Sequence, residues 1–300
     1  MSFFKAKDNA EIHFSDAGSG SPVILIHGWP LNGDMWEYQK LNFLRRGFRV
    51  ITYDRRGFGR SAHSATGYDY NTFADDLHSL IEHLKLTKVA LIGFSMGGGE
   101  IARYLSRYGA DRIACASLVG SVTPYLLKDE SNPTGIDAGV FAQMISGLEE
   151  DRPAFLTTFT KQFFGVSVVN HPVSSETQQW CLMMAMRASL LATIECVNAF
   201  GKTDFRQDLA AFTVPTFIIH GTNDKTVPFE AAGSLAAKMI PKAIFKSYEG
   251  APHGLFITHK NELNEDLGAF LEQHRIDTAS EKFGRANQVE SSKAATELAN

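Results

Sequence analysis

Two kinds of hydrophobic pattern run along the chain, and their order predicts its architecture. Near the N-terminus, Phe3 to Ala6 and Glu11 to Asp16 alternate between apolar and polar positions, which predicts an antiparallel pair at a sheet edge. Continuous apolar runs such as Val23–Ile26 follow, and these are typical of strands buried on both faces. Strands that alternate with helices indicate an α/β fold with a mostly parallel, doubly wound sheet. We predict further strands at Arg49–Tyr53, Lys88–Ile92, Ile113–Leu118, Val214–Gly221 and Ile244–Tyr248, and helices at Met35–Leu44, Thr72–Leu84 and Glu100–Leu105.

The alternation stops between about Pro124 and Phe205, where no strand-like run occurs. Because strands resume at Val214, we predict a helical cap inserted before the last two strands, over one edge of the sheet. Its predicted helices, rich in Phe, Met, Leu and Ala, are Ala138–Leu148, Pro153–Phe164 and Ser175–Ala199. Most apolar residues of the cap are expected to form its core, and a minority to line a pocket. The candidates for both roles are Phe141, Phe159, Phe163, Phe164, Trp180, Met183 and Met184.

These patterns divide the chain into three parts. The α/β core comprises residues 1–123 and 206–275, the cap residues 124–205, and a polar C-terminal tail residues 276–300. Within the tail, Ile276, Phe283 and Val289 recur at about helical spacing. We interpret the tail as a flexible extension, with a helix that docks loosely or binds a partner as the alternative.

Composition and charge narrow the class of protein. The 29 basic and 33 acidic residues give a net charge of −4, so neither nucleic acid nor an anionic membrane surface is an expected partner. No apolar leader opens the sequence, and no apolar run approaches the length of a membrane span. Cys115, Cys181 and Cys196 have no C-x-x-C spacing, which favours reduced thiols in a core. We therefore expect a cytoplasmic protein.

One serine stands in a turn between a predicted strand and a predicted helix. The segment reads Gly93-Phe94-Ser95-Met96-Gly97, and such a turn lifts a hydroxyl above the end of a parallel sheet, with a helix N-terminus beneath it. Glycine is needed on both sides because larger side chains would collide in so sharp a turn. The pattern predicts that Ser95 is a nucleophile and that the amide of Met96 stabilises an oxyanion.

An acid and a histidine follow at the ends of later strands. Asp224 comes after Val214–Gly221, and His253 comes after Ile244–Tyr248. Because the carboxyl ends of parallel strands meet at one edge of the sheet, both side chains are expected near Ser95. His253 would take the proton of the serine hydroxyl, and Asp224 would hold the histidine in the required tautomer. We predict that Ser95, Asp224 and His253 are the catalytic residues.

Other acids and histidines fit these roles less well. Asp204 and Asp208 do not follow a strand. His220 stands within a strand end beside the predicted acid and is interpreted as a structural hydrogen-bonding residue, whereas His259 and His274 lie on or beside the last helix.

The chain resembles the α/β-hydrolase superfamily, and within it the cofactor-free haloperoxidase, perhydrolase and arylesterase family, whose members are also named non-heme chloroperoxidases. The stretches that support the resemblance are His27–Pro30, Tyr53–Ser61, Gly93–Gly98, His220–Asp224 and His253–Gly254. The resemblance covers nearly the whole chain, from position 3 to about position 272. It implies an α/β-hydrolase fold and a serine esterase or lactonase with perhydrolase activity.

The resemblance also implies roles for the loop after the first buried strand. The amide of Trp29 is expected to be the second oxyanion donor, with His27 bracing the loop, and the carbonyl of Trp29 to accept a hydrogen bond from hydrogen peroxide. We assign Trp29, Pro30 and Val227 to substrate binding. The glycines of Asp54–Gly59 fit no nucleotide-binding fingerprint, and no cluster of His, Cys and Asp has metal-ligand spacing. We expect no metal and no cofactor.

A serine nucleophile implies an acyl-enzyme, and hence a small ester or lactone substrate with water or hydrogen peroxide as acceptor. Dehalogenases and epoxide hydrolases of this fold carry an aspartate at that position, so Ser95 argues against both. The first alternative is a carbon–carbon bond hydrolase of a ring-cleavage dienoate. Such a site needs cationic partners for the carboxylate, and the cap offers few: Lys128, Lys161 and Arg187. The second is a ligand-binding receptor on the same fold. A homo-oligomer is compatible with the sequence, which does not determine the number of copies.

Overall fold

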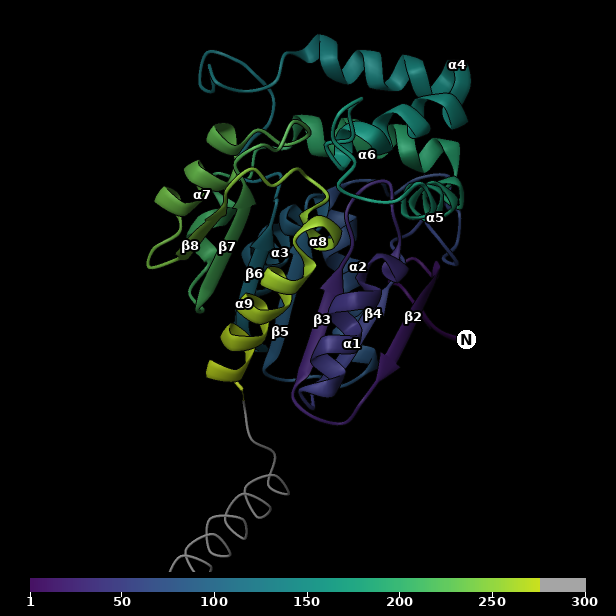
Figure 1. The fold of residues 1–300 in the computed structure, drawn as a ribbon. Coiled ribbons are helices and arrows are strands. Elements are labelled where there is room, and N and C mark those ends of the chain that lie inside the picture. The colour runs from purple at the N-terminus through teal and green to yellow at the C-terminus, as the bar shows by residue number, and fades with distance from the viewer. Residues whose placement is uncertain (276–300) are drawn as a thin grey trace, which may run out of the picture.

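An eight-stranded sheet forms the centre of the protein. The computed structural model describes residues 1–275, and the strand order is β1-β2-β4-β3-β5-β6-β7-β8 (Figure 1). β2 pairs antiparallel with both β1 and β4, and the other neighbouring strands are parallel. The mostly parallel sheet is therefore confirmed, with strand bounds shifted by at most one or two residues. The strands are β1 Ser2–Lys5, β2 Glu11–Ala17, β3 Pro22–Ile26, β4 Arg49–Tyr53, β5 Val89–Phe94, β6 Ile113–Val119, β7 Thr216–Gly221 and β8 Ile244–Tyr248.

Helices cover both faces of the sheet, as a doubly wound fold requires. α1 packs against α9 on one face, and α2 packs against α3 on the other (Figure 1). The helices of this layer are α1 Glu37–Arg45, α2 Tyr70–His83, α3 Met96–Tyr108, α7 Gly233–Met239, α8 Leu255–Thr258 and α9 Lys260–Gln273. Short 3-10 turns lie at η1 Gly33–Trp36, η2 Asp208–Ala211 and η3 Phe229–Ala231. The predicted helix at Thr72 begins earlier, at Tyr70, because the Asp69 carboxylate caps its first amides.

The apolar strands are buried on both faces, which explains their continuous hydrophobic runs. Val23 and Leu25 of β3 belong to the core cluster on the α1 and α9 face, whereas Ile24 and Ile26 belong to the opposite cluster. Successive side chains of a strand point to opposite faces of the sheet, so one short strand contributes residues to both core clusters. All three cysteines are buried in these clusters without forming a disulfide, and burial raises the pKa of each thiol to about 12.

Three helices lie between β6 and β7 in the chain and beyond the carboxyl ends of the parallel strands (Figure 1). They are α4 Ala138–Phe163, α5 Ser175–Met186 and α6 Leu190–Lys202. The helical cap before the last two strands is therefore confirmed. The boundaries predicted for the three parts of the chain are not tested and stay predictions, and the predicted tail lies outside the described residues.

The predicted division of the cap into helices needs one correction. The two helices expected before Phe164 are confirmed: α4 consists of two helices joined at a kink, and its non-helical residue, Asp151 (φ −152°, ψ 85°), falls in the predicted gap between Leu148 and Pro153. The single helix expected from Ser175 to Ala199 is wrong: α5 and α6 meet at 96°. Ser189 causes this second break, because its hydroxyl accepts a hydrogen bond from the amide of Ala192 (3.0 Å) and so starts a new helix.

Within residues 1–275, no single helix is both long enough and apolar enough to cross a membrane. The bent pair of α5 and α6 meets these two requirements together, by length and composition alone.

Two glycines allow β5, α3 and β3 to approach one another closely. A Cβ atom built on Gly97 would lie 2.5 Å from the carbonyl oxygen of Ile26, and one built on Gly93 would lie 2.5 Å from the carbonyl oxygen of Gly97. Both distances are far below a van der Waals contact, so neither position has room for a side chain. A side chain at either position would force the segments around the turn between β5 and α3 to move apart.

We expect Gly97→Ala to lower the free energy of unfolding by about 1–3 kcal/mol, because the added methyl group must push α3 away from β3. Gly139→Ala is the matched control, since a Cβ atom at that helical position meets nothing within 4 Å. The control should be neutral or stabilise the fold by up to about 1 kcal/mol. Urea unfolding of both variants measures the difference, and equal effects would contradict the explanation.

Candidate active site

Ser95 occupies the turn between β5 and α3. Its φ of 53° and ψ of −116° lie in a region that residues with a side chain rarely adopt, so the strand and helix on either side must hold it there. Its amide donates to the carbonyl of Val119 in β6 (2.9 Å), and its carbonyl accepts from the amide of Gly98 (3.0 Å). Only 5% of the residue is exposed.

His253 lies in the loop after β8 and connects the two other predicted catalytic residues. Its Nε2 atom is 2.9 Å from the Oγ atom of Ser95, and its Nδ1 atom is 2.6 Å from the Oδ2 atom of Asp224. The loop is held against the cap, since the amide of Gly254 donates to the carbonyl of Phe163 (2.8 Å). The structure therefore brings together all three residues that the sequence nominated, although their catalytic role stays a prediction.

Asp224 is held by the backbone of its own loop. Its Oδ1 atom accepts hydrogen bonds from the amides of Thr226 (2.9 Å) and Val227 (2.8 Å). Burial alone would raise the pKa of Asp224, but the charge of His253 and a hydrogen bond with His220 hold it well below its usual value. His220 also donates from Nε2 to the carbonyl of Val227 (2.9 Å), so it supports this loop, as expected of a structural residue.

The ionised carboxylate determines the tautomer of His253. A carboxylate can only accept hydrogen bonds, so the Nδ1 atom of His253 must carry the proton that points to Asp224. In the neutral ring the Nε2 atom is then unprotonated, and it accepts a hydrogen bond from the hydroxyl of Ser95. The arrangement can therefore withdraw a proton from Ser95.

Three of the other competing residues, Asp204, Asp208 and His259, have different partners. The carboxylate of Asp204 pairs with Arg206 (2.6 Å), and that of Asp208 pairs with Arg103 (3.1 Å). The Nδ1 atom of His259 hydrogen-bonds the hydroxyl of the neighbouring threonine (2.9 Å).

The two predicted oxyanion donors belong to segments that run beside Ser95. Met96 is the first residue of α3, where amides have no carbonyl partner within the helix and the helix dipole is positive. In the opposite loop, a Cβ atom built on Gly28 would lie 3.0 Å from the Cβ atom of Ser95, so this loop touches the serine. Trp29 follows, and its indole Nε1 atom donates to the carbonyl of Thr193 in the cap (3.0 Å). Their role as donors stays a prediction.

A pocket of about 410 Å³ opens beside Ser95, between the cap and the ends of the strands. Its walls are mainly apolar and aromatic, as is usual for small-molecule sites. The lining residues are Trp29, Ser95, Val122, Leu126, Ile136, Val140, Phe141, Gln143, Met144, Phe155, Thr158, Phe159, Gln162, Phe200, Lys225, Thr226, Val227 and Pro228.

The predictions for the pocket are only partly reproduced. Phe141 and Phe159 line it, and so does Val227, whereas Pro30 borders a separate, smaller cavity beneath the cap. Among the other candidates, Phe163, Phe164 and Met184 are buried in a core cluster, Trp180 borders a cavity near the N-terminus, and Met183 is exposed.

Sequence reasoning missed two aromatic residues of the pocket, Phe155 and Phe200. Phe155 belongs to a row on α4 that continues through Thr158, Phe159 and Gln162, with the spacing i, i+3, i+4 and i+7 of one helix face. That spacing was a usable signal for Phe155. For Phe200 we find no comparable signal, because its neighbours on α6 are buried in the core as well.

Comparisons with known proteins agree with this geometry. A model described as the alpha/beta hydrolase fold matches residues 21–260. The chain belongs to this family.

Similar proteins carry both peroxidase and esterase names. A crystal structure of a bromoperoxidase from Bacillus anthracis superposes with a TM-score of 0.87 at 48% identity, covering 90% of this chain and 100% of the other. A non-heme chloroperoxidase from Kitasatospora aureofaciens is 40% identical, over 90% of this chain and 99% of its own length. A bifunctional esterase/perhydrolase from Acinetobacter calcoaceticus is 37% identical, with the same coverage. With the family match, these relatives identify the protein as a hydrolase.

His27 is fully buried at the start of the loop that contains Trp29. The amide of Arg55 donates to its Nε2 atom (2.9 Å), so the proton must sit on Nδ1, which donates to the carbonyl of Gly28 (3.0 Å). Burial, followed by the positive charge of Arg55, lowers the pKa of His27 from 6.5 to about 3. The side chain is therefore neutral in the folded protein and braces the loop.

This pKa shift predicts how stability depends on pH. Below pH 6.5 the unfolded chain protonates His27 and the folded protein does not, so its contribution to stability is lost as the pH falls from 6.5 towards 3. Wild type should lose up to about 1.4 kcal/mol per pH unit more than His27→Asn in this range. Urea unfolding at several pH values measures the slopes, and replacement of the exposed His63 should leave the wild-type slope unchanged.

Proposed function

We propose that the protein is a serine hydrolase that cleaves small carboxylic esters or lactones through an acyl-enzyme. The observation that supports this most directly is the hydrogen-bonded chain from Ser95 Oγ to His253 Nε2 (2.9 Å) and from His253 Nδ1 to Asp224 Oδ2 (2.6 Å). This chain opens onto an apolar pocket of about 410 Å³. The esterase name of the Acinetobacter calcoaceticus relative agrees with the proposal.

In the first half of the reaction, the Oγ atom of Ser95 attacks the carbonyl carbon while its proton passes to the Nε2 atom of His253. Asp224 stabilises the resulting imidazolium. The amides of Met96 and Trp29 would donate hydrogen bonds to the negative oxygen of the tetrahedral intermediate. The imidazolium then returns its proton to the leaving alcohol, and the acyl group stays on Ser95.

In the second half, an acceptor attacks the acyl carbon and gives its proton to His253, which returns it to Ser95. Water as the acceptor releases a carboxylic acid, and hydrogen peroxide releases a peracid. We propose peroxide as a second acceptor because the relatives include one named a perhydrolase and several named haloperoxidases. The carbonyl of Trp29 would accept a hydrogen bond from the attacking peroxide, and oxidation of halide would follow from the released peracid.

The pocket favours small, largely apolar substrates. Of the described residues that line it, Lys225 alone carries a charge, and its side chain is exposed. Lys128, Lys161 and Arg187, which we considered as partners for a dienoate carboxylate, are not among the lining residues. The carbon–carbon hydrolase alternative therefore lacks the cations on which it depended. A cytoplasmic location and a homo-oligomeric assembly remain predictions.

The nucleophile can be tested directly. We expect Ser95→Ala to abolish labelling by a fluorophosphonate probe and to remove nearly all hydrolysis of p-nitrophenyl acetate, because no other group can form the acyl-enzyme. Formation of peracetic acid from acetate and hydrogen peroxide should vanish in the same variant. Labelling of the variant at the wild-type rate would refute the assignment, and circular dichroism checks that it is folded.

The acid has a matched control in the chain. We expect Asp224→Asn to lower kcat by about 10³- to 10⁴-fold, because the amide favours the wrong tautomer of His253. Asp208→Asn changes a carboxylate that pairs with Arg103 on α3, away from the pocket, and should leave kcat within about twofold of wild type. A large loss of kcat in the second variant but not in the first would mean that the acid is misassigned.

A further inference from the structure

A buried ion pair that the proposed reaction does not use lies beneath the site. Arg55 follows β4, Glu100 lies in α3, and at most 1% of either residue is exposed. The Oε2 atom of Glu100 accepts hydrogen bonds from the Nε (2.9 Å) and Nη2 (2.7 Å) atoms of Arg55. Its Oε1 atom accepts a hydrogen bond from the hydroxyl of Tyr53. The carboxylate and the guanidinium are therefore held rigidly against each other.

Arg55 also holds the start of the loop that contains Trp29. Its Nη2 atom donates to the carbonyl of His27 (2.9 Å), and its backbone amide donates to the Nε2 atom of His27 (2.9 Å). Arg55 thus binds both the backbone and the side chain of His27, which lies two residues before Trp29, the predicted oxyanion donor. A Cβ atom built on Gly28 would lie 3.0 Å from the Cβ atom of Ser95, so the loop that Arg55 holds runs close beside the proposed nucleophile.

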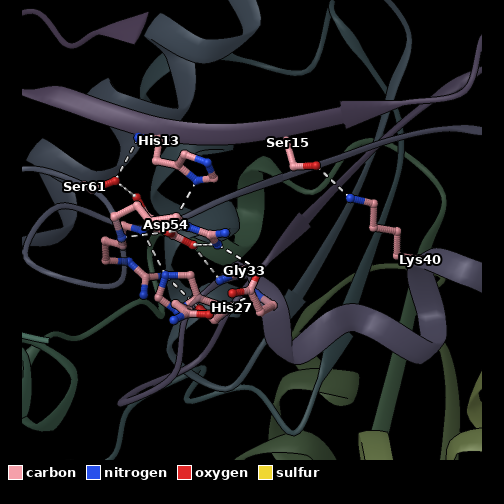
Figure 2. A network of polar contacts seen from close by, with 11 residues as sticks. His13, Ser15, His27, Gly33, Lys40, Asp54 and Ser61 are labelled. Carbon is pink, nitrogen blue, oxygen red and sulfur yellow. Dashed lines mark hydrogen bonds and ion pairs between the residues drawn. The ribbon is translucent and has the colours of Figure 1, made fainter. Parts of the chain in front are cut away.

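The residue before Arg55 holds the other end of the same loop. The Oδ1 atom of Asp54 accepts a hydrogen bond from the amide of Gly33 (2.9 Å). Figure 2 shows Asp54 between Gly33 and His13, with His27 nearby. Two consecutive residues after β4 therefore clamp residues 27–33 at both ends, and Glu100 orients one of them.

Glu100 lies on the helix that begins with Met96, so the ion pair joins the elements that hold the two amides. Met96 is the first residue of α3, and Trp29 is in the clamped loop. We propose that Arg55 and Glu100 are positioning residues that set the separation between the amides of Met96 and Trp29 and so shape the oxyanion site. This inference rests on the proposed serine hydrolase function.

Energetic considerations favour positioning over stability as the role of this pair. Taking two charges out of water is costly, so a buried ion pair is often no more stabilising than neutral residues of similar volume. By contrast, an oxyanion site works only when its donors lie at the correct distance before the charge develops. The forked guanidinium can bind Glu100 and His27 together, which the single ammonium of a lysine does less well.

The test compares two double variants that each remove a buried ion pair. Arg55→Met with Glu100→Gln removes both charges of this pair together, so neither is left buried without its partner, and the glutamine keeps an acceptor for the Tyr53 hydroxyl. The matched control is Arg56→Met with Asp76→Asn. Arg56 is equally buried and binds Asp76 (2.7 Å), but its other hydrogen bonds go to Asp8 and not to residues 27–33.

We expect the Arg55 and Glu100 variant to lower kcat for p-nitrophenyl acetate by about ten- to hundredfold, less than the loss of a whole donor. KM should stay within about twofold of wild type. Inhibition by benzeneboronic acid, whose tetrahedral adduct puts an oxygen in the oxyanion site, should weaken in parallel with kcat. The control should keep kcat and the boronic acid affinity, whatever the effect of the substitutions on its stability in urea. The kcat and boronic acid affinity of Arg55→Lys should fall between those of wild type and of the double variant. Arg55→Lys replaces the double variant in the test if the latter does not fold.

Wild-type kcat in the folded Arg55 variants would overturn the inference. So would an equal loss in the Arg56 control, or a rise in KM that accounts for the whole effect. Failure of the proposed function would give a different result, because wild type itself would then show no turnover that depends on Ser95.

Discussion

The site depends on a close backbone contact, that between Gly97 at the start of α3 and Ile26 at the end of β3. It brings the first turn of the helix close to the loop that follows β3, in which Gly28 lies beside Ser95. The same approach forces Ser95 to a positive φ, which a sheet and a helix packed on both sides can sustain. The residues that we propose as nucleophile and oxyanion donors are thus brought together by one packing constraint.

The cap completes the site because it is hydrogen-bonded to the loop after each of three strands. Trp29 after β3 donates to Thr193 of α6, and Gly254 after β8 donates to Phe163 of α4. The side chain of Gln162 in α4 donates to the carbonyl of Lys225 after β7 (3.2 Å). The loops that carry Trp29, Asp224 and His253 are therefore tied to the helices that form the pocket wall. A displacement of the cap would disturb the chemistry as well as substrate binding.

The charged residues Asp54, Arg55 and Arg56 beneath the site each have a partner of opposite charge. Arg55 binds Glu100, and Arg56 binds Asp76 and Asp8, while Asp54 is held by Arg60 and backbone amides. Burying a charge without a partner is costly, so these pairs allow a short run of charged residues to pass through the interior. These residues bind different parts of the protein. Asp54 and Arg55 hold the loop beside Ser95, whereas Arg56 binds α2 and the N-terminal region.

By itself, the sequence determined the sheet, the turn at Ser95 and the chain order of Ser95, Asp224 and His253. Strand runs and glycine-flanked turns are local patterns, and a parallel sheet gathers the ends of its strands at one edge without further information. The tertiary structure alone decided which cap residues line the pocket, where Ser189 breaks a predicted helix, and which acid Arg55 binds. Phe200 and Phe164 have the same chemical character in the sequence and are both buried in core clusters, yet of the two only Phe200 also lines the pocket. Such differences arise from contacts between segments far apart in the chain, which no local pattern encodes.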